Sequence, residues 1–156
     1  MKNKLASEVK LIKFNEISDD RGKLISLESN MNIPFNIERV YYLFDTQNGV
    51  ERGFHAHIDL QQVAICLSGS CTIDVEHING KTSYNLDTPN TGLFMGGLVW
   101  REIRNISNGC VLMVAADALY TEDDYIRDYA TFKNHLKLLT STDQDLEKQN
   151  VNTHSK

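Results

Sequence analysis

Residues 62–86 read QVAICLSGSCTIDVEHINGKTSYNL, and this stretch decides the fold class. The run from Gln62 to Leu67 is almost continuously apolar, as expected of a buried strand. The run from Cys71 to Glu76 alternates apolar and polar side chains, which is typical of a strand with one face in water. Asn79-Gly80 then favours the positive φ values of a tight type I′ turn before Lys81 to Leu86. The stretch therefore predicts successive β-strands, the last two joined as a hairpin.

Short strand-like segments continue on both sides of this stretch. Turn signals such as Asp19-Asp20-Arg21-Gly22 and Asn48-Gly49 separate them, and no long helical period interrupts them. The segments are Val9 to Ile17, Lys23 to Glu28, Ile37 to Phe44, Gly92 to Trp100, Arg101 to Ile106 and Val111 to Ala116. Eight or more short strands predict an all-β fold, either a sandwich or a small barrel.

The character of the sequence changes beyond residue 120. Apolar side chains recur at spacings of three and four between charged residues, at Tyr125, Tyr129, Phe132, Leu136 and Leu139. This spacing predicts a C-terminal helical segment. The acidic residues of the run Glu122-Asp123-Asp124-Tyr125 are expected to cap that helix, because negative charge is favoured at a helix N-terminus.

The length of 156 residues is that of one domain. We expect a single domain over residues 1–139, followed by a polar, mobile tail over residues 140–156. The tail carries too few large apolar groups to offset the entropy of ordering it.

Composition excludes several classes of partner. The formal net charge is -5, and Lys and Arg form no basic stripe, which argues against nucleic-acid binding. No apolar run approaches the roughly 18 residues of a membrane span, and the N-terminus lacks the apolar core of a signal peptide. We therefore expect a cytoplasmic protein that does not bind membranes. Cys66, Cys71 and Cys110 lie in apolar or alternating runs and are expected to be buried free thiols.

A pair of histidines carries the strongest chemical signal. His55 and His57 lie in the run Arg52-Gly53-Phe54-His55-Ala56-His57. On a strand, residues two apart project to the same face with Cα atoms about 6.5–7 Å apart, so both rings can face one ligand. Imidazole can take and give a proton near neutral pH. The pair therefore indicates either proton transfer on a small polar substrate or a metal site.

The surrounding residues argue against a metal. The run from His55 to Gly69 resembles the first motif of the metal-binding cupin barrels, G-x5-H-x-H-x3-4-E-x6-G, but Gln62 stands in the place of the glutamate. The second cupin motif is matched only loosely, with no histidine between Pro89 and Asn105. Two imidazoles and an amide are a poor ligand set for zinc, iron or manganese. We expect no metal and no organic cofactor.

A narrower resemblance covers the chain from about Glu38 to Tyr129. That segment resembles the metal-independent cupins that are 3,4-ketoisomerases of thymidine-diphosphate-4-keto-6-deoxyglucose. The matching segments are Arg39-Val40-Tyr41-Tyr42, residues 52–57, Gly69-Ser70-Cys71, Gly92-Leu93, Val99-Trp100-Arg101-Glu102-Ile103, Gly109-Cys110-Val111-Leu112 and Tyr120 through Asp123-Asp124-Tyr125-Ile126-Arg127. The resemblance implies a cupin-type jelly-roll barrel, a homodimer, and a place in the biosynthesis of deoxy and amino sugars for surface polysaccharides such as O-antigen.

The resemblance also implies roles for single residues. His55 and His57 match the two catalytic histidines, and their division of labour stays open. The hydrogen on carbon 3 is acidic because it lies next to the carbon 4 carbonyl, so a base can remove it if the enediolate is stabilised. Reprotonation at carbon 4 gives the 3-keto sugar, with a configuration that the sequence does not fix.

Six further residues are candidates for substrate binding. Arg52 could hold a diphosphate or enediolate oxygen, and Arg101 the pyrophosphate. Tyr41 and Tyr42 point to opposite faces of one strand, so only one of them can face the site. Trp100 could stack on thymine or sugar or could be a core residue at the barrel rim, and Gln62 follows the histidines on a neighbouring strand.

Two alternatives remain beside the ketoisomerase. A deoxysugar 3,5-epimerase shares the barrel, but its site typically pairs one histidine with a separate tyrosine and aspartate. A non-enzymatic nucleotide-sugar-binding module is the other, since cupin barrels often serve as ligand domains.

Overall fold

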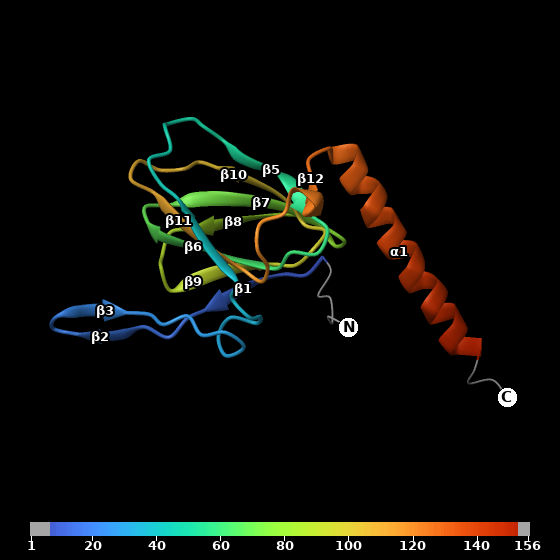
Figure 1. The fold of residues 1–156 in the computed structure, drawn as a ribbon, viewed down its shortest axis with the longest axis horizontal. Helices are drawn as coiled ribbons and strands as arrows, with labels where there is room; N and C mark the ends of the chain where they lie inside the picture. The colour runs from blue at the N-terminus through green and yellow to red at the C-terminus, as the bar shows by residue number, and fades with distance from the viewer. Residues whose placement is uncertain (1–6, 153–156) are drawn as a thin grey trace.

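The computed structural model describes residues 7–152, with side chains as far as residue 141, as two five-stranded antiparallel sheets that face each other (Figure 1). The first sheet has the order β1-β9-β6-β11-β4, with bounds Val9–Lys13, Thr91–Met95, Gln62–Ser68, Val111–Ala116 and Arg39–Leu43. The second has the order β12-β5-β10-β7-β8, with bounds Tyr125–Ile126, Arg52–His57, Trp100–Arg104, Cys71–His77 and Gly80–Leu86. The expected all-β, cupin-type fold is confirmed.

The stretch that decides the fold behaves as predicted. Strands β7 and β8 pair from Cys71↔Leu86 to His77↔Gly80, and Gly80 has the positive φ that such a tight turn uses. Strand β6 belongs to the other sheet. The short turn around Gly69 therefore carries the chain from one layer to the next.

The core lies between the two sheets. Inward-facing side chains alternate with outward-facing ones along each strand, and the inward set packs into one buried cluster that includes Ala64, Ile73, Val75, Leu93 and Val114. The same inner faces also carry Tyr41, Gln62 and Arg101. Tyr41 lies opposite Val114, Arg101 lies opposite Val75, and Gln62 is two residues before Ala64 on β6. The candidate site is thus a polar continuation of the barrel interior.

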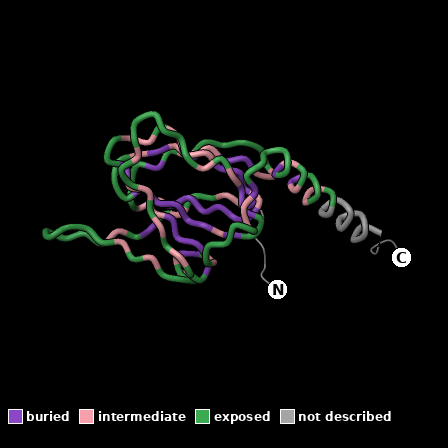
Figure 2. Tube along the Cα trace, turned by 45° about the horizontal axis from the view of Figure 1, so that its top comes forward, coloured by how far each residue is buried: buried purple, intermediate pink, exposed green. Residues whose placement is uncertain are grey.

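Each sheet is also covered on its outer face. Phe14 and the segment around Ile33 and Phe35 pack over the first sheet. Phe132 and Leu136, from helix α1 (Tyr129–Asn152), pack over the second against Ala56 and Trp100. In Figure 2 the buried stretches gather between the sheets and where the helix meets the barrel.

A two-stranded arm leaves the barrel near its N-terminal edge. Strands β2 (Ile17–Asp19) and β3 (Gly22–Leu24) pair only with each other and project away from the two sheets (Figure 1). The apolar side chains of Ile17 and Leu24 on this arm are mostly exposed.

The C-terminal prediction needs two corrections. Residues Glu122–Asp124 form a 3-10 turn (η1) and Tyr125–Ile126 forms β12, so the helix begins four residues later than the apolar spacing suggested. Asp128 caps it instead, because its Oδ2 accepts a hydrogen bond from the Thr131 backbone N–H at 2.7 Å.

The helix also continues beyond the expected domain boundary at residue 139, as far as Asn152. The reason is local: the Leu, Glu, Gln and Lys residues of this polar segment have good helix propensity. Residues 140–152 are thus helical, the mobility expected of this tail stays a prediction, and residues 153–156 lie outside the described part. Within that part, no helix is long and apolar enough to cross a membrane.

Candidate active site

The two histidines lie side by side on strand β5. Their ring centroids are 5.0 Å apart in an edge-to-face arrangement, and Tyr125 contacts both rings, at 4.9 Å from His55 and 4.3 Å from His57. His57 is buried and His55 is half-buried. The expected convergence of both rings on one face is confirmed.

A bulge in β5 places Arg52 on that same face. Arg101 lies opposite His55 and Ile103 lies opposite Arg52, although Arg52 and His55 are three positions apart in the sequence, an odd number. Residues directly opposite in an antiparallel pair share a face of the sheet, and Ile103 packs against the inner core. The extra residue of the bulge therefore places Arg52 on the inner face of the sheet. Arg52 is still exposed to solvent there, because it lies at the end of the strand.

A carboxylate orients His57. The Nδ1 atom of His57 lies 3.0 Å from Oδ2 of Asp124, and Oδ1 of the same carboxylate accepts the Asp59 backbone N–H at 2.9 Å. Because a carboxylate can only accept here, the proton sits on Nδ1 of His57 and leaves Nε2 with a free lone pair. That Nε2 is buried without a hydrogen-bond partner among the described residues.

His55 is fixed in the same tautomer by the backbone. Its Nδ1 lies 3.0 Å from the Gly53 carbonyl oxygen, which accepts its proton and leaves Nε2 available as a base. Both rings therefore offer an unprotonated nitrogen.

Burial and positive charge keep both imidazoles neutral. Burial, followed by the nearby Arg101 guanidinium, lowers the pKa of His55 to about 4. The same two causes, with added repulsion from His55 and Arg39, lower the pKa of His57 to about 2. The Asp124 carboxylate opposes this shift at His57. At neutral pH both rings are ready to accept a proton.

Arg101 is a buried cation without a partner. Its side chain is 3% exposed, and none of its three side-chain nitrogens has a hydrogen-bond partner in the described part of the chain. Burial lowers the pKa of Arg101 to about 10, so the guanidinium stays charged at neutral pH. An unpaired buried charge is costly, and Arg101 is therefore placed to meet an anionic or strongly polar ligand.

Of the two tyrosines on β4, Tyr41 faces the interior. Gln62 Nε2 donates a hydrogen bond of 2.9 Å to the Tyr41 hydroxyl, which leaves the hydroxyl proton for another acceptor. Tyr42 points outward, is 61% exposed and packs against Phe44. Tyr42 therefore lies on the outer face of the sheet, away from the histidine pair.

Trp100 lies on the outer face of the second sheet, away from the histidines. It packs against Tyr129 and Phe132, and its Nε1–H donates to Glu102 at 3.0 Å. The structure supports the alternative in which Trp100 is a core residue, and it gives no support to stacking of Trp100 on the substrate.

The comparisons with known proteins agree on one family. Residues 7–137 match the family described as FdtA: WxcM-like, C-terminal. The chain belongs to this family. It is 48% identical over 129 residues to the TDP-4-oxo-6-deoxy-alpha-D-glucose-3,4-oxoisomerase of Aneurinibacillus thermoaerophilus, which covers 83% of this chain and 93% of the relative.

Solved structures of similar proteins extend the match to three dimensions. A mutant of the 3,4-ketoisomerase QdtA from Thermoanaerobacterium thermosaccharolyticum, in complex with TDP-4-keto-6-deoxyglucose, superposes with a TM-score of 0.80 at 42% identity, covering 83% of this chain and 94% of that one. A 3,4-ketoisomerase from Helicobacter canadensis gives 0.80 at 44% identity, covering 83% and 98%. The resemblance drawn from the sequence is confirmed.

Sequence reasoning missed several residues around the FdtA-type histidine pair. A small cavity of about 100 Å³ beside His57 is lined by Arg39, Asp124 and Tyr125 among others. Arg39 lies over the rings of Tyr41 and Tyr120, and its Nε is buried without a partner among the described residues. The residues from Tyr120 to Arg127 carried part of the family resemblance, but their acidic side chains were assigned to helix capping.

A metal ion does not fit among these donors. The Gln62 amide is engaged with Tyr41, and the charged Arg101 guanidinium interacts with both histidines. A divalent cation placed between the rings would be repelled by this fixed positive charge. The residues suit an anion instead.

Proposed function

We propose that the protein is a 3,4-ketoisomerase that converts dTDP-4-keto-6-deoxyglucose into the corresponding 3-keto sugar without a metal or organic cofactor. The observation that carries the proposal is the pair of neutral imidazoles facing the unpaired Arg101 cation. Membership of the family, and the names of relatives more than 40% identical, support the same reaction.

The reaction is an exchange of protons within one sugar. A histidine Nε2 removes the hydrogen from carbon 3, and the electron pair moves onto the carbon 4 oxygen to give an enediolate. A proton then moves from the carbon 3 hydroxyl to the carbon 4 oxygen, and carbon 4 receives a proton from a protonated histidine, so that carbon 3 becomes the carbonyl. His55 and His57 share these transfers, one as the base at carbon 3 and the other as the carrier between oxygens or to carbon 4.

Two cationic positions divide the substrate between them. Arg101 lies beside both histidines, so it stabilises the enediolate oxygen together with the Tyr41 hydroxyl. Arg39 lines the cavity beside His57, where it suits the diphosphate. Arg52 begins β5, at the end of that strand away from His57, and stays a candidate for another part of the substrate. This assignment moves the diphosphate contact from Arg101, its first candidate, to Arg39.

Assembly and pathway belong to the same proposal. We propose a homodimer, because the exposed arm residues Ile17 and Leu24 and the outer-face residues Tyr42 and Phe44 leave apolar surface uncovered. Free buried cysteines are usual in a reducing compartment, which supports a cytoplasmic enzyme. A 3-keto sugar is the substrate that an amino group transfer would need, in keeping with amino-sugar synthesis for surface polysaccharides such as O-antigen.

The decisive experiment follows the carbonyl by NMR. Incubation with dTDP-4-keto-6-deoxyglucose in D₂O should move the carbonyl from carbon 4 to carbon 3 and place deuterium at carbon 4, and the product spectrum then gives the configuration there. His55→Asn and His57→Asn should each lose turnover by at least 100-fold but still bind the nucleotide sugar. The variant that loses exchange at carbon 3 identifies the base.

His135→Asn, at a half-buried position of helix α1 outside the histidine site, is the matched control and should keep full activity. An epimerase would exchange hydrogens at carbons 3 and 5 while the carbonyl stayed at carbon 4, and a binding module would bind without turnover. Either result, or full activity in both histidine variants, would refute the ketoisomerase mechanism.

A further inference from the structure

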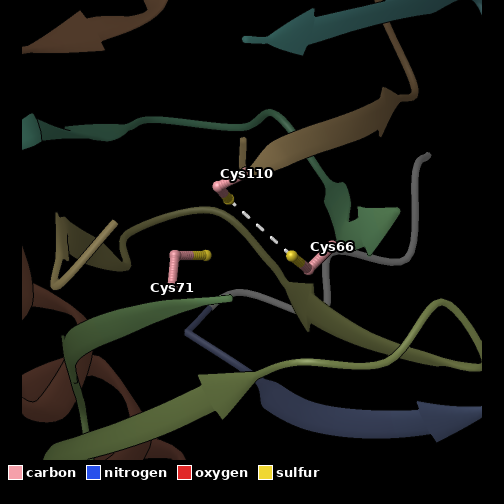
Figure 3. A group of neighbouring side chains, drawn as sticks. All are labelled: Cys66, Cys71 and Cys110. Atoms are coloured by element: carbon pink, nitrogen blue, oxygen red, sulfur yellow. Dashed lines mark hydrogen bonds between the residues drawn. The ribbon is translucent and has the colours of Figure 1, made fainter. Parts of the chain in front are cut away.

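Three thiols meet in the core, outside the site described above. Cys66 lies on β6, Cys71 begins β7, and Cys110 directly precedes β11. Their side chains converge in Figure 3, all three are buried, and their sulfur atoms lie within 4.8 Å of one another. They are the only cysteines of the chain, and none forms a disulfide.

The spacing of the sulfurs matches three-coordinate metal binding. With a metal–sulfur bond of about 2.3 Å, a flat trigonal site separates its sulfurs by about 4.0 Å. The Cys66 and Cys110 sulfurs are 3.8 Å apart, and the longest separation among the three is no more than 4.8 Å. Closing the set requires sulfur movements of less than about 1 Å.

We propose that Cys66, Cys71 and Cys110 form a binding site for a soft, thiophilic d¹⁰ metal ion, with Zn²⁺ or Cu⁺ as physiological candidates. Thiolate sulfur selects such ions over magnesium or calcium, which prefer oxygen donors. The site is separate from the histidine pair, and the isomerisation proposed above does not use it.

The surroundings offer the ion few competing ligands. Cys71 and Cys110 line a tight recess, together with apolar residues and Thr46, that has no room for a water molecule. This recess shares no lining residue with the cavity beside His57. Because its other lining residues are mainly apolar, the three sulfurs are the dominant ligands.

Binding must expel protons. Burial raises the pKa of the Cys66 thiol to about 12 and also raises that of Cys71, so these thiols are protonated at neutral pH. For a divalent ion the balance is M²⁺ plus three R–SH giving M(SR)₃⁻ plus three H⁺. The affinity should therefore rise steeply with pH.

Cadmium ion is a suitable probe, because its thiolate complexes absorb in the ultraviolet by charge transfer. The full-length protein, reduced with a phosphine, is titrated with Cd²⁺ at several pH values. We expect one Cd²⁺ per chain, a new thiolate-to-cadmium absorption, close to three protons released, and the steep pH dependence given above. Binding without proton release, or no such absorption with Cd²⁺ in slight excess, would overturn the proposal.

Variants locate the site. Cys71→Ala and Cys110→Ala should each weaken Cd²⁺ binding by at least 100-fold, and Cys71→Ser covers the case in which the smaller side chain impairs folding. Val114→Ala opens the same core cluster without removing a sulfur and should bind Cd²⁺ like the parent protein. Equal binding by the parent and the Cys71 variants would show that the ion lies elsewhere and would refute the assignment.

Discussion

Replacing Asp124 by Asn tests how His57 is held. Oδ1 of Asp124 accepts the Asp59 backbone N–H at 2.9 Å, and Oδ2 faces His57 Nδ1 at 3.0 Å. An asparagine that keeps the first bond must place its carbonyl oxygen at the Oδ1 position and its NH₂ group against the ring. The NH₂ group can only donate, so Nδ1 of His57 becomes the acceptor and the proton moves to Nε2.

The wrong tautomer removes the free lone pair that faces the cavity. Restoring the Nδ1–H tautomer leaves the amide NH₂ group and the ring N–H facing each other without an acceptor, which costs about 1–3 kcal/mol. This corresponds to a roughly 5- to 160-fold loss in kcat, with KM changed less than about threefold. Steady-state kinetics with dTDP-4-keto-6-deoxyglucose, read by NMR, measures both constants.

Asp123→Asn is the matched control, because it makes the same chemical change at an exposed neighbour and should leave kcat unchanged. Wild-type kcat in Asp124→Asn would refute the orienting role. A loss confined to KM would refute it as well, since the residue would then act in binding rather than on the base.

Three further predictions follow from the geometry. Gly53→Ala should lower the free energy of unfolding by about 2 kcal/mol or more, because Gly53 has φ +88° and an added Cβ would lie 2.7 Å from the Arg101 carbonyl oxygen. The control Gly109→Ala, at φ +73° with open space around it, should cost only about 1 kcal/mol. Equal losses for the two variants in thermal denaturation would exclude the close approach at Gly53. Tyr41→Phe should reduce kcat by about 10-fold or more through the lost donor, whereas Tyr42→Phe should be neutral, and the reverse order would contradict the inward assignment of Tyr41. The rate constant kcat/KM should stay constant down to about pH 5 and fall only as His55 is protonated, because the pKa of His55 is lowered to about 4 and only the neutral ring is a base. A midpoint near 6.5 in the pH profile would show that burial does not control the pKa of the base.

Periodicity predicted the strands well because the barrel interior imposes it. Strands β7, β8 and β11 lie close to their expected bounds, since every second side chain enters one continuous core. The C-terminal region was harder. Tyr125 fits a helical spacing in the sequence, but its backbone pairs with His57 across β12 and β5, and no local pattern reports a partner 68 residues away.

The site shows the same division between local and distant information. The histidine pair follows from strand geometry alone, because both residues sit on β5. The side chain of Asp124 reaches His57 from another part of the chain, so its role could not be separated from helix capping. The inward turn of Arg52 depends on a bulge, which a strict alternation of side chains would miss.

The unpaired Arg101 cation explains why such weak bases can serve. Burial and Arg101 together lower the pKa of His55 from 6.5 to about 4, a loss of about 3 kcal/mol in proton affinity. Only part of that loss reaches the transition state, about half in a reaction where the proton is half transferred. A preorganised donor facing the enediolate oxygen returns about 3–4 kcal/mol. The free energy that the cation contributes to stabilising the enediolate therefore exceeds the part of the lost proton affinity that reaches the transition state. The imidazoles also stay unprotonated over the whole physiological pH range.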